Sequence, residues 1–302
     1  MRAQIRSYAG TQLRRNAATQ IRNWRMGVVC ALSIWFALSG TVHAEQVQIA
    51  PEALAILRRV AVQHNGRNKP LDSFARETLQ LITGEAAIGH EDPVQTVFSI
   101  MADPQRWQDA PLISVPFIPL REALGIGPKM SHVSYNQLVS TRSLMRLLPP
   151  IMEKQRRDEK LSILENETMD AFQRFVALSE LLEQKLHLVP PPRASERVWS
   201  PILQPQGHLA GLQQAIIDAW TQVIMAVRTG QPDAMSATAH RLASALFVVN
   251  PSDDPPAWRL QLEVFYNHIH PFRIAQLVYL LAIIGLALGM TKPASPWSRI
   301  GL

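Results

Sequence analysis

The stretch that decides the fold is Val62-Gln63-His64-Asn65-Gly66-Arg67-Asn68-Lys69-Pro70-Leu71-Asp72-Ser73-Phe74-Ala75. Asn65-Gly66 is a strong turn signal, because both residue types accept a positive φ at little steric cost. Pro70 fixes its own φ and keeps Lys69 extended. The segment is therefore predicted to form a stiff turn that presents two cations, Arg67 and Lys69, beside a histidine.

From Leu71 onward the spacing of apolar residues becomes helical. The positions that share one face are Leu71, Phe74, Ala75, Thr78, Leu79 and Ile82. Gly84 follows where a C-cap glycine is expected, and Asp72 or Ser73 is expected to cap the first free amides. The pattern predicts a capped helix over 71–83. On spacing alone, a solvated loop before a helix is the plainer interpretation, and nothing selects a ligand.

The positive charge of the chain is confined to its N-terminal segment. The formal net charge is +6, and residues 1–44 hold six arginines and no acidic residue. Removing these six from the 30 basic residues leaves as many bases as the 24 acids. The neutral remainder argues against a nucleic-acid partner.

A targeting signal explains this basic segment. The arginines precede an apolar run, Met26–Leu38, and then small residues that end at Ala44. This order predicts a signal peptide cleaved after Ala44, or an uncleaved signal anchor, and export in either case. The sole cysteine, Cys30, lies in the apolar run. A Cys-x-x-Cys redox motif and covalent haem attachment through Cys-x-x-Cys-His are therefore excluded.

Helical spacing recurs outside the motif, over 51–62, 93–102, 135–188, 208–229 and 232–249. The third block is expected to pause at Pro149-Pro150. Its second part, 151–187, is expected to be one helix that reaches roughly 55 Å at 1.5 Å per residue. The charge run Glu153–Lys160 is predicted to be a solvated face of that helix.

Prolines at 104, 111, 116, 119 and 128 favour extended segments and turns between Asp103 and Val133. Within them, Pro111–Ile118 is the only plausible strand, and its prolines place it at an edge. The sequence thus predicts a mainly α fold with a minor extended/β region at about 104–133. The expected parts are a signal peptide or anchor (1–44), an exported helical region (45–188), a Pro-rich linker (189–207), a second helical region (208–271), a transmembrane helix (272–290) and a cytoplasmic tail (291–302).

The transmembrane prediction rests on Ile274–Met290, where Gln276 is the only strongly polar side chain. The run is at the short end for a membrane span, and Phe272 extends it. A buried core helix is the alternative. Lys292 and Arg299 would then lie on the cytoplasmic side, as the positive-inside bias prefers.

Just before this run, Glu263, Tyr266 and Asn267 are three and four residues apart, so they share one helical face. Pro271 and Phe272 complete this membrane-proximal motif. Tyr266 has an alternative role as an ordinary interfacial aromatic residue.

No residue pattern indicates a metal site or an active site. His268 and His270 are two apart, which places them on nearly opposite helix faces, and no His-x-x-x-His pair is present. The chain has no Gly-x-Ser-x-Gly and no phosphate-binding glycine loop. No catalytic residue is assigned, and an enzyme acting alone is not expected.

Two segments resemble one family. Val62-Gln63, followed by Gly66-Arg67-x-Lys69-Pro70-Leu71-Asp72-Ser73-x-Ala75, resembles a signature of certain cytochrome c biogenesis proteins. These proteins form the CcsA/ResC group of the system II machinery. Glu263-x-x-Tyr266-Asn267-x-x-x-Pro271-Phe272 looks like the end of the same exported domain. The tryptophan-rich haem-handling loop and the multi-span bundle of that group are absent from this chain.

The resemblance implies a membrane-tethered periplasmic component of c-type cytochrome biogenesis in the inner membrane. Such a component would be a non-catalytic assembly or docking part of a haem lyase/synthetase complex. Its implied partners are a multi-span biogenesis protein and apocytochrome c, with haem held through the partner subunit. The residues suggested for haem or partner binding are His64, Arg67, Lys69 and Asp72. The competing hypothesis is an envelope scaffold unrelated to haem that uses the 151–187 helix as a partner surface.

Overall fold

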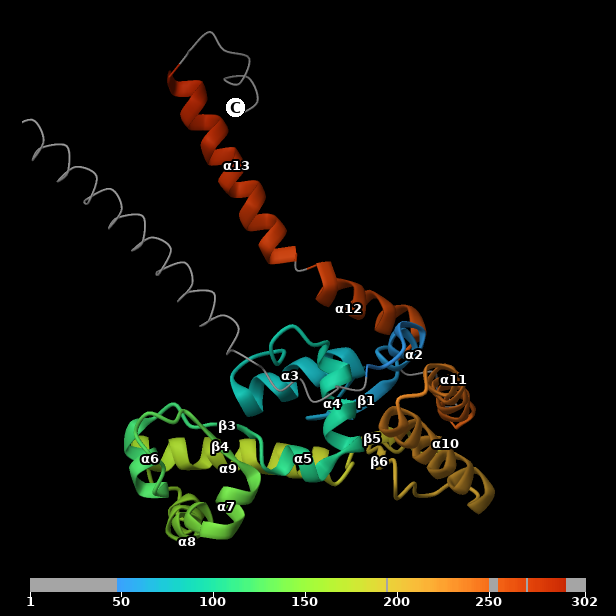
Figure 1. Cartoon of the computed structure of the whole chain (residues 1–302), viewed down its shortest axis with the longest axis horizontal. Coiled ribbons are helices and arrows are strands. Elements are labelled where there is room, and N and C mark those ends of the chain that lie inside the picture. Colours follow the sequence, from blue (N-terminus) through green and yellow to red (C-terminus); the bar gives the residue numbers. More distant parts are fainter. Residues whose placement is uncertain (1–47, 194, 250–254, 270, 292–302) are drawn as a thin grey trace, which may run out of the picture. The chain divides into compact units, whose positions relative to one another are not determined.

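The computed structural model describes residues 48–193, 195–249, 255–269 and 271–291 (Figure 1). Within these residues the chain is mainly helical, as predicted, and three two-stranded antiparallel sheets accompany the helices. The signal segment 1–44, with Cys30 and Ala44, and the tail from 292 lie outside the described residues. Their roles remain predictions.

The opening motif forms a β-hairpin. Helix α2 (Pro51–Leu57) ends early, and strands β1 (Ala61–His64) and β2 (Arg67–Pro70) pair around Asn65-Gly66. Both turn residues have positive φ, 51° and 73°, which confirms the turn prediction. The predicted 51–62 helix is wrong at its end, because β1 begins at Ala61. The expectation that 111–118 holds the only strand is also wrong, because β1 and β2 lie outside it. Val60 and Val62 are buried and alternate with less buried neighbours. Alternating burial of β-branched side chains is typical of a strand, which is why the chain leaves the helix before these residues.

Helix α3 (Leu71–Thr83) confirms the predicted bounds, and Gly84 ends it with φ 87°. All six residues of its predicted apolar face are buried. The predicted cap is wrong: Pro70 is the N-cap residue, and neither Asp72 nor Ser73 caps the helix. Their side chains serve tertiary contacts instead. Helix α4 (Pro93–Ala102) packs against α3 and matches its prediction.

Two helices were missed between 104 and 133. The chain forms α5 (Pro104–Gln108), β3 (Pro111–Ser114), α6 (Ile118–Leu124) and β4 (His132–Ser134), and β3 pairs with β4. Pro104 and Pro119 lie in the first turns of α5 and α6, where a missing N–H costs nothing. The prolines therefore begin helices here, while the predicted strand is confirmed over Pro111–Ser114.

The predicted helix over 151–187 is wrong. Helix α7 (Tyr135–Thr141) leads into α8 (Ser143–Arg156), which contains Pro149-Pro150 without a break, and α9 spans Ile163–Leu182. The break falls at 157–162, where Asp158 has φ 57°. Ser162 and Glu165 form a reciprocal capping box that begins α9. The local capping signal decided the boundary.

The segment predicted as a linker is part of the folded core. Strands β5 (His187–Val189) and β6 (Ser200–Pro201) pair, and Val189 and Trp199 are buried. The Gln63 side chain holds this segment to the hairpin, because its Oε1 accepts from the Trp199 amide at 2.9 Å. Its Nε2 also donates to the Arg197 carbonyl at 2.7 Å. The described residues from 48 onward consequently fall into one compact unit.

The remaining helices complete the core and reach the second motif. Helices α10 (Ala210–Thr229) and α11 (Pro232–Val248) match their predictions and lie side by side (Figure 1). Trp220 of α10 is fully buried against Phe98 of α4. Helices α12 (Ala257–Ile269) and α13 (Pro271–Thr291) follow.

The predicted membrane helix 272–290 falls within α13. No single helix in the described part of the chain is long and apolar enough to cross a membrane. The segments Ala257–Ile269 and Ile274–Ala287, bent by 46° at their junction, meet that criterion only together.

Candidate functional site

The two motifs predicted separately from the sequence meet in the structure. Helix α12 packs against α3 and β2. Glu263 of α12 links both elements: Arg67 Nη2 donates to its Oε2 at 2.7 Å, and Ser73 Oγ donates to its Oε1 at 2.7 Å. The contact therefore joins residues 190 and 196 positions apart in the chain.

Asn267, one turn further along α12, makes the second link. Its Nδ2 donates to Asp72 Oδ2 and to Ser73 Oγ, both at 2.9 Å. Asp72 is fully buried, and Arg76 donates to the same carboxylate from Nε at 3.0 Å. We call the hydrogen-bonded set Arg67, Asp72, Ser73, Arg76, Glu263 and Asn267 the motif network. Its two cations and two carboxylates balance, so the network itself carries no net charge.

Lys69 does not lie where the sequence placed it. The turn was expected to present Lys69, but its side chain is only 4% exposed and pairs with Glu77 of α3. Arg67, in contrast, has a side chain that is 54% exposed although it is paired with Glu263. Of the two predicted cations, only Arg67 is therefore available to a ligand.

His64 is half-buried at the end of β1. Burial, and next the positive charge of Lys69, lower the pKa of His64 below 6.5, so a neutral imidazole is favoured. Lys69 Nζ lies 3.4 Å from His64 Nδ1. Because an ammonium only donates, Nδ1 must accept and the proton sits on Nε2. His64 could therefore ligate a metal through Nδ1 only after Lys69 moved away.

A cavity of about 290 Å³ adjoins His64, and His187 and Thr78 also line it. His187 Nδ1 lies 2.8 Å from the Trp199 carbonyl and donates to it. The Thr78 hydroxyl is buried and has no hydrogen-bond partner among the described residues. At this volume the cavity lies at the lower limit for small-molecule sites.

A second cavity, of about 450 Å³, lies beside the motif network. It is lined by Arg67, Ser73, Arg76, Glu77, Arg259, Leu262, Glu263, Tyr266 and Asn267. Arg259 has no carboxylate partner among the described residues, and the sequence analysis missed it. Its position four residues before Glu263 was the available signal, because that spacing puts both side chains on neighbouring positions of α12.

The membrane-proximal motif divides in the structure. Glu263 and Asn267 face α3, while Tyr266 lines the cavity and is 47% exposed. Pro271 and Phe272 begin α13 outside the motif network, and Phe272 is exposed. The predicted shared face is thus used by two of its three residues for packing.

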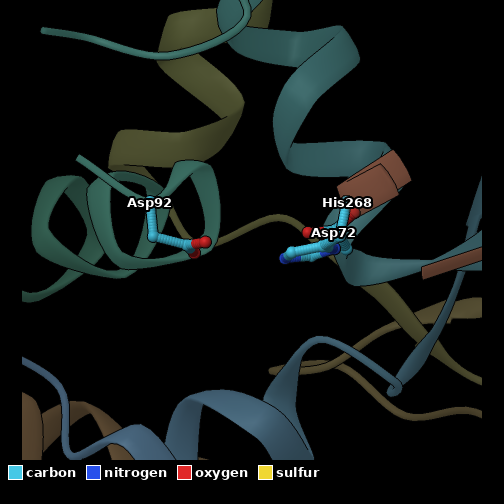
Figure 2. A group of neighbouring side chains, drawn as sticks. All are labelled: Asp72, Asp92 and His268. Atoms are coloured by element: carbon cyan, nitrogen blue, oxygen red, sulfur yellow. The ribbon is translucent and has the colours of Figure 1, made fainter. Parts of the chain in front are cut away.

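One group of side chains has the composition of a metal site. Asp72, Asp92 and His268 bring ligand atoms to within 4.8 Å of one another, from α3, the N-terminus of α4 and α12 (Figure 2). The sequence search, which looked for spacings within one helix, could not find a group assembled from three elements.

The carboxylates of this group already have partners. Asp92 Oδ2 accepts from Arg58 at 2.7 Å, and Asp92 also caps α4. Asp72 is bound to Arg76 and Asn267. A divalent cation would meet two guanidinium groups, so the residues fit an ion-pair cluster better than a metal centre.

Comparison with known proteins gives one partial similarity. The chain is 32% identical to protein NrfI of Wolinella succinogenes over 82 residues, which are 27% of this chain and 9% of NrfI. No protein-family model matches the chain. The match covers less than a tenth of NrfI, and membership in the CcsA/ResC group stays a prediction.

Proposed function

We propose that this chain is a membrane-tethered assembly or docking module of c-type cytochrome biogenesis, on the periplasmic side of the inner membrane. The observation that carries the proposal is the motif network. Both segments that resemble biogenesis proteins contribute to it, although they lie 190 or more residues apart. The partial similarity to NrfI supports the same pathway.

The geometry divides the motif residues into two roles. Asp72, Ser73 and Asn267 are buried or half-buried and hold α12 on the domain. Arg67 and Arg259 face the 450 Å³ cavity and supply positive charge there. A haem propionate or an acidic partner surface would be bound by these two guanidinium groups through charge-assisted hydrogen bonds.

The proposed partner is a multi-span biogenesis membrane protein, with apocytochrome c as a further partner and haem held through the partner subunit. Affinity purification of the full chain from membranes tests this directly. We expect such a multi-span protein to co-purify. Its absence, with the chain intact and abundant, would contradict the docking role.

The cellular test uses Arg67→Ala together with Lys69→Ala. We expect loss of haem-stained c-type cytochromes at unchanged levels of the variant protein. The matched control is Arg156→Ala with Arg157→Ala, which removes two exposed cations at the C-terminal end of α8 that pair with the nearby acids Glu153 and Glu159. Normal maturation in the first variant would refute the role of this turn.

A charge swap separates holding from ligand binding. Arg67→Glu combined with Glu263→Arg keeps an ion pair between β2 and α12 but moves the cation. Restored maturation means that the pair serves only to hold α12. Failure of the swap, with α12 still docked, means that the cation must lie at position 67.

His64 as a haem ligand is a more specific version of the proposal. Its neutral imidazole fits that role, but the contact with Lys69 opposes it. We expect added haem to give a Soret shift with the purified full chain that weakens in His64→Ala and strengthens in Lys69→Met. A spectrum unaffected by either substitution excludes ligation by His64.

The competing scaffold hypothesis depended on one long helix over 151–187. The structure divides that region into α8 and α9 at a capped break. The extended partner surface that motivated the hypothesis is therefore absent from the described residues, and no other observation favours it.

A further inference from the structure

Helix α12 turns a mixed polar and apolar face inward and an apolar face outward. Leu260, Glu263, Val264 and Asn267 are its less exposed residues, and of these Glu263 and Asn267 bind α3 and β2 in the motif network. Trp258, Leu262, Phe265 and Ile269 follow the helical period on the opposite side. All four are exposed, Leu262 by 57% and Phe265 by 60%. We call these four residues the α12 stripe.

The chain that follows α12 indicates what covers the stripe. One residue separates α12 from α13, and the described side chains of α13 from Phe272 to Leu286 are mostly large, apolar and exposed. A helix that is apolar on all sides is suited to a protein core or to lipid. No core surrounds α13 among the described residues, and the α12–α13 pair together has the length and composition of a bent membrane span.

The flank of the stripe is cationic. Leu262 of the stripe and Tyr266 line the same cavity as three arginines and two glutamates, which are Arg67, Arg76, Arg259, Glu77 and Glu263. Next to it, a cavity of about 570 Å³ is lined by Arg67, Arg259, Arg193 and Arg197, and among the described residues Glu196 is the one acidic residue in its lining. An apolar face with Trp, Phe and Leu beside arginines is the composition of helices that lie at the surface of anionic membranes.

We propose that the α12 stripe lies in the interface of an anionic phospholipid bilayer, with these arginines at the level of the lipid phosphates. This rests on the membrane tether of the proposed function and is independent of the cytochrome pathway. Trp258 and Phe265 would sit among the headgroups and upper acyl chains, where aromatic side chains are enriched. Because α12 also holds the motif network, the hairpin would be fixed close to the membrane surface.

Fluorescence quenching in the full chain tests the proposal. In a Cys30→Ser background, single cysteines replace Leu262, Phe265 or, as a control, Met225, an apolar residue of α10 that is 50% exposed. Each is labelled with NBD, and the protein is placed in phosphatidylcholine nanodiscs with or without phosphatidylglycerol. We expect spin-labelled phospholipid to quench positions 262 and 265 severalfold more than position 225, and aqueous iodide to do the reverse.

Two results would overturn lipid contact. One is iodide quenching at 262 and 265 equal to that at 225, and the other is shielding from both quenchers, which indicates a protein contact.

A second comparison tests whether the arginines contribute to lipid binding. Phosphatidylglycerol should increase lipid quenching, and Arg197→Gln with Arg259→Gln should remove that increase. An unchanged increase refutes the role of the arginines. Lipid contact by a chain that co-purifies with no multi-span biogenesis protein would refute the proposed function and leave this inference standing.

Discussion

Asn267→Ala tests whether the motif network holds α12 on the domain. The substitution removes one hydrogen bond to the buried Asp72 carboxylate and one to the Ser73 hydroxyl, both 2.9 Å long. A bond to a charged group contributes about 1.5–3 kcal/mol and a neutral one about 0.5–1.5 kcal/mol. Because Arg76 still donates to Asp72, we expect about 2–3 kcal/mol of lost docking free energy.

Hydrogen exchange of the full chain in nanodiscs measures this loss. At about 1.4 kcal/mol per tenfold, α12 amides should exchange roughly 30- to 150-fold faster, while those of α10 stay unchanged. Gln261→Ala is the control, because Gln261 is an exposed residue of the same helix. Combining Asn267→Ala with Ser73→Ala should cost less than the sum of the two single changes, since they share a bond.

The result that would refute this reasoning is α12 exchange in Asn267→Ala equal to that of the wild type or of Gln261→Ala. Helix α12 would then be held without Asn267, by the hydrogen bonds of Glu263 to Arg67 and Ser73 and by the burial of Leu260. The presence of Asn267 in the motif would have to be explained by ligand binding rather than by packing.

Three further predictions concern pH and backbone conformation. Burial and the charge of Lys69 lower the pKa of His64 in the folded protein. As the pH falls, the unfolded chain therefore protonates His64 at a higher pH than the folded protein does, and the free energy of unfolding should decrease between pH 6.5 and the lowered pKa. Denaturant titrations should show less of this slope in His64→Gln, and NMR should show a higher His64 pKa in Lys69→Met. The hydrogen bond from Lys154, then those of Ser162, hold the pKa of Glu165 at about 2. Carbon NMR should find it raised toward 4.5 in Lys154→Met, and the stability that this carboxylate confers should disappear between pH 4.5 and 2 in the wild type. Gly84→Ala should lower the free energy of unfolding by about 1 kcal/mol, because φ is 87° at this position. Gly127→Ala should leave the free energy of unfolding unchanged, because a Cβ added at Gly127 would meet no atom within 4 Å.

Local signals in the sequence were reliable where one residue type fixes the backbone. Asn65-Gly66 and Gly84 were placed correctly, because few residues accept their positive φ. Ser162-x-x-Glu165 carried an equally local signal that was overlooked in favour of the apolar period through 151–187. Short apolar runs such as Val60-Ala61-Val62 fit a helix or a strand equally well, and there the pairing with β2 decided.

The sequence by itself determined the hairpin turn, the helix that follows it and two motifs worth attention. Only the tertiary structure decided that these motifs are one site, because a hydrogen bond between Ser73 and Glu263 depends on packing across 190 residues. It also decided which cation is available. Arg67 and Lys69 are two residues apart on β2 and therefore lie on the same face. Arg67, next to the turn, has a side chain that is 54% exposed, whereas Lys69 is 4% exposed and pairs with Glu77 of α3. Charge can be read from the sequence, but whether a charged side chain stays exposed follows from what packs against the strand at that position.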